Sequence, residues 1–316
     1  MRLLILGYSS IVERRILPAA AAIPEISEVA IASKSKPAPA TGWPKQGRFF
    51  EDYSVALDES GCDVVYLSLP NAFHEHWALE ALKRGKHILI DKPALMTLDR
   101  SEMLLAEAKR RGLLIAEATV FARHPHFHAL VDFSVENGPL TQVAAQFIIP
   151  PLPISNFRNS ESLGGGCLLD MGPYAAGLIR ILGGGEPSSL AALAGGRHPD
   201  TGVDMGFSVQ AKLANGANFS GHFSFEGEYQ NRLIVVSRHG SVIVERVFSP
   251  PGDSRVEWRR RVRNVETVVT FDPADTFMLF IQATLSAISS GKHDALHSDL
   301  LTDARIRAAI SSALAA

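Results

Sequence analysis

The first third of the chain alternates short apolar runs with segments of helical periodicity. The runs are typical of buried strands, and several end at glycine or proline: Leu3–Leu6, Val29–Ala32, Val64–Leu69, His87–Ile90 and Leu113–Ala116. Helices are predicted between them at Ile11–Ala22, at Glu75–Arg84, and from a capping box of Asp99 and Glu102 to Gly112. Strands that alternate with helices over short connections indicate a doubly wound parallel sheet with helices on both faces.

The pattern changes after about Arg123. Strand-like runs now follow one another, separated by turn signals such as Asn215-Gly216 and His239-Gly240: Thr141–Ile149, Met205–Leu213, Asn218–Phe225, Arg232–Ser237 and Ser241–Val247. Helices are expected at Met171–Leu182, at Thr276–Ser289 and in an Ala-rich segment toward the C-terminus. We therefore predict an α/β domain over residues 1–121 and an α+β domain over 122–316, with a mostly antiparallel open sheet.

Composition narrows the class of protein. The formal net charge is -2, and the longest cationic run is Arg259-Arg260-Arg261, which is expected on a solvated strand face. Nucleic acid is therefore not the expected partner, since phosphate binding needs a basic face. No run reaches the length of a membrane span or a signal peptide, so the expected location is the cytoplasm. Cys62 and Cys167 lie far apart in the sequence, without the spacing of a zinc site or a disulfide framework, and are expected to be reduced thiols.

The turn after the first strand is a candidate phosphate loop. A strand, a glycine and a helix N-terminus present backbone N–H groups to a pyrophosphate, and Gly7 stands at the first position of such a loop. Ser9 and Val12 replace the other two glycines of the usual GxGxxG pattern. Taken alone, the segment could equally be an unrelated strand-turn-helix. Ser9 is small, and its hydroxyl could donate to a phosphate.

The end of the second strand predicts the cofactor. An enzyme that uses NAD usually places a carboxylate there for the ribose hydroxyls, whereas a cation suits the 2′-phosphate of NADP. Ser33-Lys34-Ser35-Lys36 contains no acid. With the phosphate loop before it, this segment favours NADP(H) over NAD(H), and without that loop it would be a solvated turn.

Several short stretches between residues 1 and 182 resemble, in the right order, the glucose-fructose oxidoreductase, inositol dehydrogenase and MocA (Gfo/Idh/MocA) family. They are Gly7–Ala19, Leu69-Pro70-Asn71 with His74 and Asp91-Lys92-Pro93, Glu117-Ala118 with Arg123-His124-Pro125, and Asn156-Phe157-Arg158 with Gly164–Tyr174. The family usually has Glu-Lys-Pro where this chain has Asp91-Lys92-Pro93, and many members have His in place of Tyr174. In having a tyrosine at this position, the chain resembles the subgroup that contains dihydrodiol dehydrogenases, aldose dehydrogenases and nucleotide-sugar ketoreductases.

The resemblance implies hydride transfer between nicotinamide and a carbonyl or carbinol carbon of a sugar-like substrate. It implies catalytic roles for Lys92, Asp170 and Tyr174. It also implies that Arg123, Arg158 and Asp170 bind the substrate. The cofactor residues that it implies are Gly7, Ser9, Ser10, Ile11, Ser33, Lys34, Pro70, Asn71, His74, Asp91 and Lys92. It also implies pairing of the open sheet with other subunits, as a homodimer or homotetramer.

The positions and chemistry of Lys92, Asp170 and Tyr174 suit the catalytic roles that the resemblance implies. Lys92 follows a buried parallel strand, at the sheet edge where such folds bind ligands, and its ammonium can stabilise negative charge on a substrate oxygen. A cis bond is compatible with Lys92-Pro93. Asp170 and Tyr174 are four residues apart, on one face of a helix, although spacing alone slightly favours an N-cap and a core tyrosine. A phenol can give a proton to a developing alkoxide.

Alternatives come from the same residues. His124, His126 and His128 suggest a metal, but no Cys or acid lies at ligand spacing and Pro125 interrupts the pattern, so no metal is expected. His124 or Arg123 is expected instead to line a cleft between the domains. The missing glycines of the phosphate loop leave open a catalytically silent, ligand-binding regulator, and the architecture also fits an imine or bilin reductase. Retention of the Lys–Asp–Tyr set favours a sugar-like carbonyl.

Overall fold

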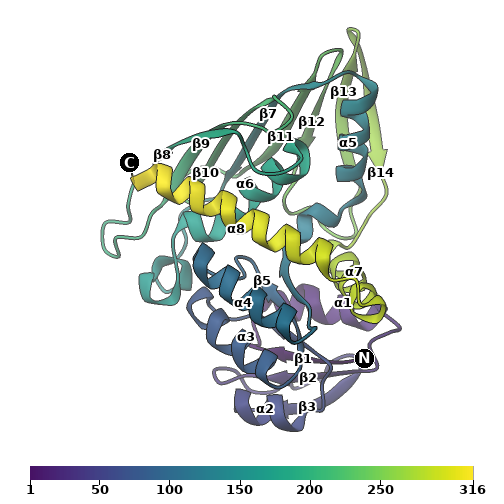
Figure 1. Ribbon diagram of the computed structural model, residues 1–316, viewed down its shortest axis with the longest axis vertical. Coiled ribbons are helices and arrows are strands. Elements are labelled where there is room, and N and C mark those ends of the chain that lie inside the picture. Colours follow the sequence, from purple (N-terminus) through teal and green to yellow (C-terminus); the bar gives the residue numbers. More distant parts are fainter. Residues whose placement is uncertain (316) are drawn as a thin grey trace. The chain divides into compact units, whose positions relative to one another are not determined.

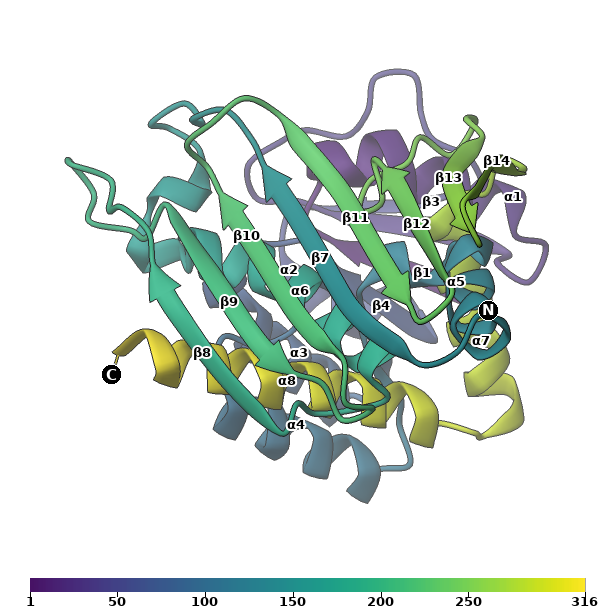
Figure 2. The ribbon, with the colours of Figure 1, turned by 90° about the horizontal axis from the view of Figure 1, so that it is seen from above.

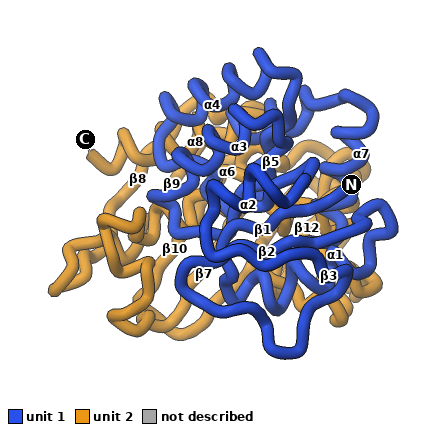
Figure 3. The backbone as a smooth tube through the Cα atoms, turned by 90° about the horizontal axis from the view of Figure 1, so that it is seen from below, with its two compact units in different colours: residues 1–118, 277–301 blue, residues 119–276, 302–316 orange. Residues whose placement is uncertain are grey.

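The computed structural model describes residues 1–315, which form two compact units (Figure 3). Unit 1 comprises residues 1–118 and 277–301, and unit 2 comprises residues 119–276 and 302–316, of which the last is not described. The predicted domain division, 1–121 and 122–316, stays a prediction. The compact units differ from it because residues 277–301 return to the first unit.

The sheet of unit 1 is parallel throughout and has the strand order β3-β2-β1-β4-β5-β6 (Figure 1). Its strands are β1 (Arg2–Leu6), β2 (Glu28–Ala32), β3 (Gln46–Phe50), β4 (Val64–Leu67), β5 (His87–Asp91) and β6 (Ile115–Ala118). β4 is buried along its whole length, as a strand covered on both faces must be. The predicted doubly wound α/β architecture is confirmed.

Most helices of unit 1 connect these strands, whereas α7 (Thr276–Ser290), whose first residue belongs to unit 2, and the first part of α8 (Asp294–Ala315) follow the strands of unit 2 in the chain. The connecting helices are η1 (Val12–Ile16), α1 (Leu17–Ala22), α2 (Tyr53–Glu59), η2 (Asn71–Phe73), α3 (His74–Lys83) and α4 (Leu98–Arg110). The predicted capping box at Asp99 and Glu102 is wrong. Thr97 is the N-cap of α4, because its backbone is extended (φ −128°) and the helix begins at the next residue. Its hydroxyl donates to Asp99 and caps no backbone N–H.

Unit 2 is built on an eight-stranded sheet with the order β14-β13-β12-β11-β7-β10-β9-β8 (Figure 2). Its strands are β7 (Leu140–Ile148), β8 (Ser189–Ala194), β9 (Gly206–Lys212), β10 (Asn218–Ser224), β11 (Gln230–Ser237), β12 (Gly240–Glu245), β13 (Val256–Val262) and β14 (Val265–Phe271). Only β7 and β10 pair in parallel among these strands. The prediction of a mostly antiparallel second sheet is confirmed.

One face of this sheet carries the core of unit 2. Inward residues alternate with outward ones, as in β11, where Leu233 and Val235 are fully buried and Ile234 is not. Helix α6 (Cys167–Gly183) packs on the inward face against β7, β9 and β10. The other helices that contribute to unit 2 are η3 (Val120–Arg123), α5 (Pro125–Glu136), η4 (Phe157–Asn159), η5 (Glu161–Leu163) and the second part of α8 (Asp294–Ala315).

Candidate functional site

The phosphate-loop candidate begins with a glycine that no other residue could replace. Gly7 has a φ of 95°, and a Cβ atom there would lie 2.2 Å from the Ser68 carbonyl oxygen. Ser9 follows two residues later, and its hydroxyl accepts the backbone N–H of Val12 at 3.2 Å. Ser10 is exposed and Ile11 is half-buried at the start of the helix. The loop therefore keeps the tight turn and the helix N-terminus on which pyrophosphate binding depends.

The segment after β2 places a cation over two aromatic rings. Ser33 is buried, and its hydroxyl accepts the backbone N–H of Lys36. Lys34 is half-exposed, with its ammonium 5.1 Å from the centre of the Tyr53 ring and 5.5 Å from that of Trp77. Two aromatic faces thus hold the cation near the end of β2. The carboxylate of Asp52 lies 3.9 Å from the same ammonium.

Lys92 lies in a turn that buried side chains fix in place. The Lys92–Pro93 peptide is cis. The carboxylate of Glu117 accepts the N–H of Ala94 at 2.8 Å, and the His74 ring lies 3.0 Å from the Pro93 carbonyl and 2.9 Å from the Leu69 carbonyl. His74 is fully buried, and burial lowers the pKa of its imidazole. His74 therefore joins the Leu69-Pro70-Asn71 loop to the Lys92 turn.

Asp91 terminates a chain of hydrogen bonds that reaches the phosphate loop. Its carboxylate accepts the Tyr66 hydroxyl at 2.6 Å and the Ser68 hydroxyl at 2.7 Å. The Ser68 hydroxyl also lies 2.8 Å from that of Ser9. Tyr66 is fully buried, and burial together with the neighbouring carboxylate raises the pKa of its phenol well above 10. Asp91 is thus a fixed hydrogen-bond acceptor beside Lys92. Its side chain is shorter than that of the glutamate that the family usually has there, and its carboxylate is satisfied by the hydroxyls of Tyr66, in β4, and Ser68, directly after β4.

In unit 2 the first turn of α6 is anchored from outside the helix. The Asp204 carboxylate accepts the N–H of Leu168 at 2.6 Å, and the Arg158 carbonyl accepts the N–H of Gly166 at 2.8 Å. Gly166 has a φ of 107°, and a Cβ atom there would lie 2.2 Å from the Asp204 carboxylate. The glycine run thus lets the backbone approach Asp204 closely. Burial raises the pKa of Asp204.

This helix carries both of the predicted catalytic residues of unit 2. Asp170 forms an ion pair with Arg158 at 2.9 Å, and its side chain is 13% exposed. It lies in the first turn of α6, so it is not an N-cap. The half-buried Tyr174 follows one turn later, and its ring packs 5.0 Å from the rings of Phe147 and Phe248. Both side chains are therefore held in place by packing and charge.

The histidines before α5 do not lie in an open site. His124 and His126 are fully buried, and the Nδ1 atom of His124 accepts the N–H of His126 as a helix cap. Burial therefore excludes His124 of the two residues expected to line a cleft, whereas Arg123 is half-buried. Among residues 1–315 no group of three metal-ligating side chains comes together. Over the same range no helix is long and apolar enough to cross a membrane.

The predicted residues thus form two groups. Gly7, Ser9, Ser33, Lys34 and the Lys92 turn belong to unit 1. Unit 2 holds the residues predicted to bind substrate, Arg123, Arg158 and Asp170, and the predicted catalytic Tyr174. The sequence did not point to Tyr66 or Asp204 as supports of these groups. Both act on residues far away in the chain, and no local pattern marks such a contact.

Comparison with known proteins assigns both the N-terminal and the C-terminal part of the chain to one family. Residues 1–119 match the family described as "Oxidoreductase family, NAD-binding Rossmann fold", and residues 130–243 match the "GFO/IDH/MocA C-terminal domain". The chain belongs to the Gfo/Idh/MocA family. It is therefore an oxidoreductase with a dinucleotide-binding Rossmann domain, as the sequence resemblance predicted.

Nucleotide-sugar reductases are among the similar members of the family. The dTDP-3,4-didehydro-2,6-dideoxy-alpha-D-glucose 3-reductase of Actinomadura kijaniata is 32% identical, over 96% of this chain and 94% of its own. The reductase of the same name from Saccharopolyspora spinosa is also 32% identical, over 83% and 79%. A crystal structure of a 3-ketoreductase from A. kijaniata with NADP and TDP-benzene has a TM-score of 0.91 and 29% identity, covering 99% of this chain and 98% of that one.

Proposed function

We propose that this protein is an NADP(H)-dependent reductase that transfers a hydride between nicotinamide and a carbonyl or carbinol carbon of a nucleotide-linked sugar. Two similar proteins are named as reductases of a dTDP-linked keto sugar, and a 3-ketoreductase from A. kijaniata was crystallised with NADP and TDP-benzene. The chain retains a lysine, an aspartate and a tyrosine that suit this chemistry, which disfavours a silent regulator.

The residues of unit 1 fit a dinucleotide. Gly7 leaves the space that any side chain would fill, and the start of the following helix presents its N–H groups. Lys34 supplies a cation at the end of β2, and Ser33 is adjacent to it. Together they suit the 2′-phosphate of NADP better than two ribose hydroxyls. When bound, the nicotinamide supplies or accepts the hydride.

The protein's own part in the reaction is to hold the oxygen and move one proton. In the reducing direction the Tyr174 hydroxyl gives its proton to the carbonyl oxygen, which becomes the hydroxyl of the carbinol. The Lys92 ammonium stabilises negative charge on that oxygen as the carbon is reduced. Asp170, held by Arg158, accepts hydrogen bonds from neighbouring sugar hydroxyls and fixes their orientation. In the oxidising direction Tyr174 takes the proton back.

The Lys92 turn is the observation that carries this proposal. A surface lysine after a strand needs no support, yet Glu117 and His74 fasten the backbone on its C-terminal side and Tyr66 and Ser68 fasten Asp91 on the other. Such buried support is what a precisely placed catalytic cation requires.

The direct test is to incubate the protein with NADPH and a panel of dTDP- and UDP-linked 3- and 4-keto sugars. We expect absorbance at 340 nm to fall and the corresponding carbinol to appear by mass spectrometry. Free keto sugars without a nucleotide serve as the comparison and should react with a much higher KM. Tight NADPH binding without turnover of any keto sugar would instead favour a regulatory member of the family.

A further inference from the structure

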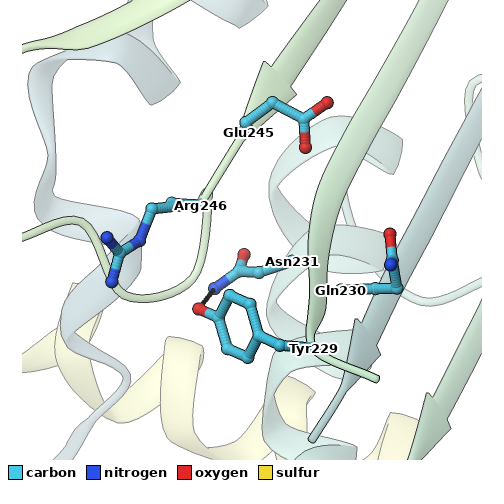
Figure 4. Close-up of a pocket in the computed structure, with 5 residues that line it drawn as sticks. All are labelled: Tyr229, Gln230, Asn231, Glu245 and Arg246. Atoms are coloured by element: carbon cyan, nitrogen blue, oxygen red, sulfur yellow. Dashed lines mark hydrogen bonds between the residues drawn. The ribbon is translucent and has the colours of Figure 1, made fainter. Parts of the chain in front are cut away.

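At one end of the large sheet of unit 2 lies a cavity of about 500 Å³ that none of the predicted site residues lines. Its wall consists of Tyr229, Gln230, Asn231, Glu245 and Arg246 (Figure 4). They come from the start of β11 and the end of β12. This volume lies within the range of small-molecule sites.

Asn231 organises this wall and turns two hydroxyls into donors. Its side chain is buried, its amide oxygen accepts the N–H of Phe248, and its amide nitrogen donates to the hydroxyls of Tyr229 and Ser249 at 3.0 Å each. Because both hydroxyls already accept a hydrogen bond, each has its own proton to give. The two oxygens are 3.4 Å apart, so at most one of these protons can be used between them. At least one hydroxyl donor remains for a ligand.

Arg246 adds the charge. Its φ of 55° lies in the left-handed region that residues other than glycine rarely adopt, and its backbone N–H donates to the Asn231 carbonyl. The side chain is exposed, and within residues 1–315 its guanidinium forms no hydrogen bond or ion pair. In Figure 4 the guanidinium points away from the Glu245 carboxylate. Arg246 thus places at the cavity a guanidinium that is available to bind a ligand.

Glu245 does not cancel that cation. The Nη2 atom of Arg232 lies 2.7 Å from one of its carboxylate oxygens, and Nη2 of Arg259 lies 3.7 Å from the same oxygen. Two guanidinium groups therefore lie beside this carboxylate, and with Arg246 counted the local charge is positive. Donors and positive charge together select a ligand rich in anionic oxygens.

One phenylalanine ring connects the cavity wall to the tyrosine proposed as the proton donor. The Tyr229 ring lies 6.4 Å from the ring of Phe147, which lies 5.0 Å from that of Tyr174. A nucleotide-linked sugar carries its diphosphate on the anomeric carbon, one pyranose ring away from the carbons that can be ketones. One such molecule can therefore place its carbonyl near Tyr174 and its phosphates in the cavity.

We propose that the cavity lined by Tyr229, Asn231 and Arg246 binds the diphosphate of a nucleotide-linked substrate. This inference rests on the proposed function for its choice of ligand. The Arg246 guanidinium and at least one of the hydroxyls that Asn231 orients donate to the phosphate oxygens. The site selects the nucleotide-linked sugar over the free sugar, and it contributes to binding but not to the hydride or proton transfer.

Calorimetry with dTDP, on enzyme saturated with NADPH so that the cofactor site is filled, tests the site without turnover. Arg246→Asn removes the cation and keeps a residue that tolerates the left-handed backbone. We expect this variant to weaken dTDP binding by about 10- to 100-fold, the usual effect of losing a charge-assisted phosphate contact. Arg246→Lys should recover part of the affinity. Arg255→Asn, which removes an exposed arginine of the same unit that lies 3.8 Å from Asp272, is the matched control and should bind dTDP like the wild type.

Steady-state kinetics separate the two proposals. If the pocket proposal holds, Arg246→Asn raises KM for the nucleotide-linked sugar and leaves kcat and the rate with free sugar unchanged. If the wild type binds dTDP through Arg246 but reduces no keto sugar, the proposed function fails while the pocket stands. Equal dTDP affinity in Arg246→Asn and wild type, or no dTDP binding to the wild type at millimolar concentration, overturns the pocket.

Discussion

The carboxylate of Asp204 accepts the backbone N–H of Leu168 at 2.6 Å, so a residue that precedes β9 acts as the N-cap of α6. A helix N-terminus normally takes its cap from the residue just before it, but that residue here is Gly166, which has no side chain. Asp204 lies 36 residues beyond Leu168 in the chain. The orientation of the helix that carries Asp170 and Tyr174 therefore depends on a distant loop.

Replacement of Asp204 by alanine should destabilise the protein by about 1–2 kcal/mol and also lower turnover, because α6 loses its cap. Asp204→Asn keeps an acceptor oxygen and should lose less of both. Thermal unfolding and NADPH oxidation with a keto-sugar substrate measure the two effects. Asp200→Ala, in the exposed turn of the same loop, is the matched control. Unchanged stability in Asp204→Ala would show that the cap contributes little.

Tyr174→Phe should leave NADPH affinity intact and lower kcat by about 10²–10⁴-fold if Tyr174 is the sole proton donor. The phenylalanine keeps the packing against Phe147 and Phe248, so stability should change little. Lys92→Ala should be at least as damaging, because the substrate oxygen loses its cation. Nicotinamide fluorescence reports cofactor binding and single-turnover kinetics report the chemical step. Near-normal turnover in either variant would exclude that residue from the mechanism.

Much of the fold was predictable because its buried strands are uniformly apolar. β4 and β5 have interior residues that are all buried, and their sequences show it. The strands that were not predicted lie at sheet edges or beside them. β3 contains Gly47 and Arg48, and β14 has no fully buried residue. Pairing with a neighbour forms such strands, and a single sequence does not display that pairing.

For the candidate site, the sequence indicated the chemistry but not its supports. Lys92, Asp170 and Tyr174 stand in recognisable motifs. Tyr66 looks like any apolar residue of a buried strand, and Asp204 lies in an irregular loop, so only the fold shows that they hold Asp91 and α6. The Tyr229–Arg246 cavity was not predictable from the sequence for the same reason, because it forms only when β11 and β12 pair.

Stability should fall in acid because of His126. Burial lowers the pKa of this imidazole to about 3, from an ordinary value of 6.5, and nearby His124 adds to the effect. Above pH 6.5 the ring is neutral in both states and has no effect. As the pH falls below 6.5 the unfolded chain binds a proton that the folded chain does not, so stability is lost progressively down to about pH 3. The slope for this one group is at most about 1.4 kcal/mol per pH unit.

Comparison of variants isolates this contribution from that of the other acid-sensitive groups. His126→Asn removes the titration and keeps an oxygen that can accept the Trp258 indole N–H. The melting temperature of this variant should fall less steeply between pH 6.5 and 4 than that of the wild type. His128→Asn, at an exposed position of the same helix, should follow the wild type. Parallel curves for His126→Asn and the wild type would contradict the prediction.

The outer face of the large sheet should bury a subunit interface. Ile234 and Ile243 are paired neighbours on β11 and β12, and both belong to the face opposite α6. Ile148, on β7, adds a third half-buried apolar side chain. Light scattering at micromolar concentration should show a dimer or tetramer, and Ile234→Arg should shift it toward the monomer. A monodisperse wild-type monomer would be inconsistent with this interface.

Cofactor choice can be tested at Lys34. Its ammonium lies over the rings of Tyr53 and Trp77 at the end of β2, so it is held in place although its side chain is 52% exposed. A 2′-phosphate is a dianion, and a charge-assisted contact of this kind contributes roughly 1.5–3 kcal/mol, or one to two decades of affinity. NADH has no such phosphate and loses nothing when the cation is removed. We therefore expect NADPH to bind more tightly than NADH.

Lys34→Ala should weaken NADPH by about 10- to 100-fold and leave NADH unchanged, and the NADPH effect should shrink as salt is raised, because the cation is partly exposed. Lys83→Ala removes a lysine of equal exposure (51%) on α3 and serves as the control. Fluorescence titration with both reduced cofactors supplies the dissociation constants. Tighter NADH binding in the wild type would reject the NADP preference. A Lys34→Ala change that weakens both cofactors alike would mean that the lysine supports the fold of this edge and does not recognise the phosphate.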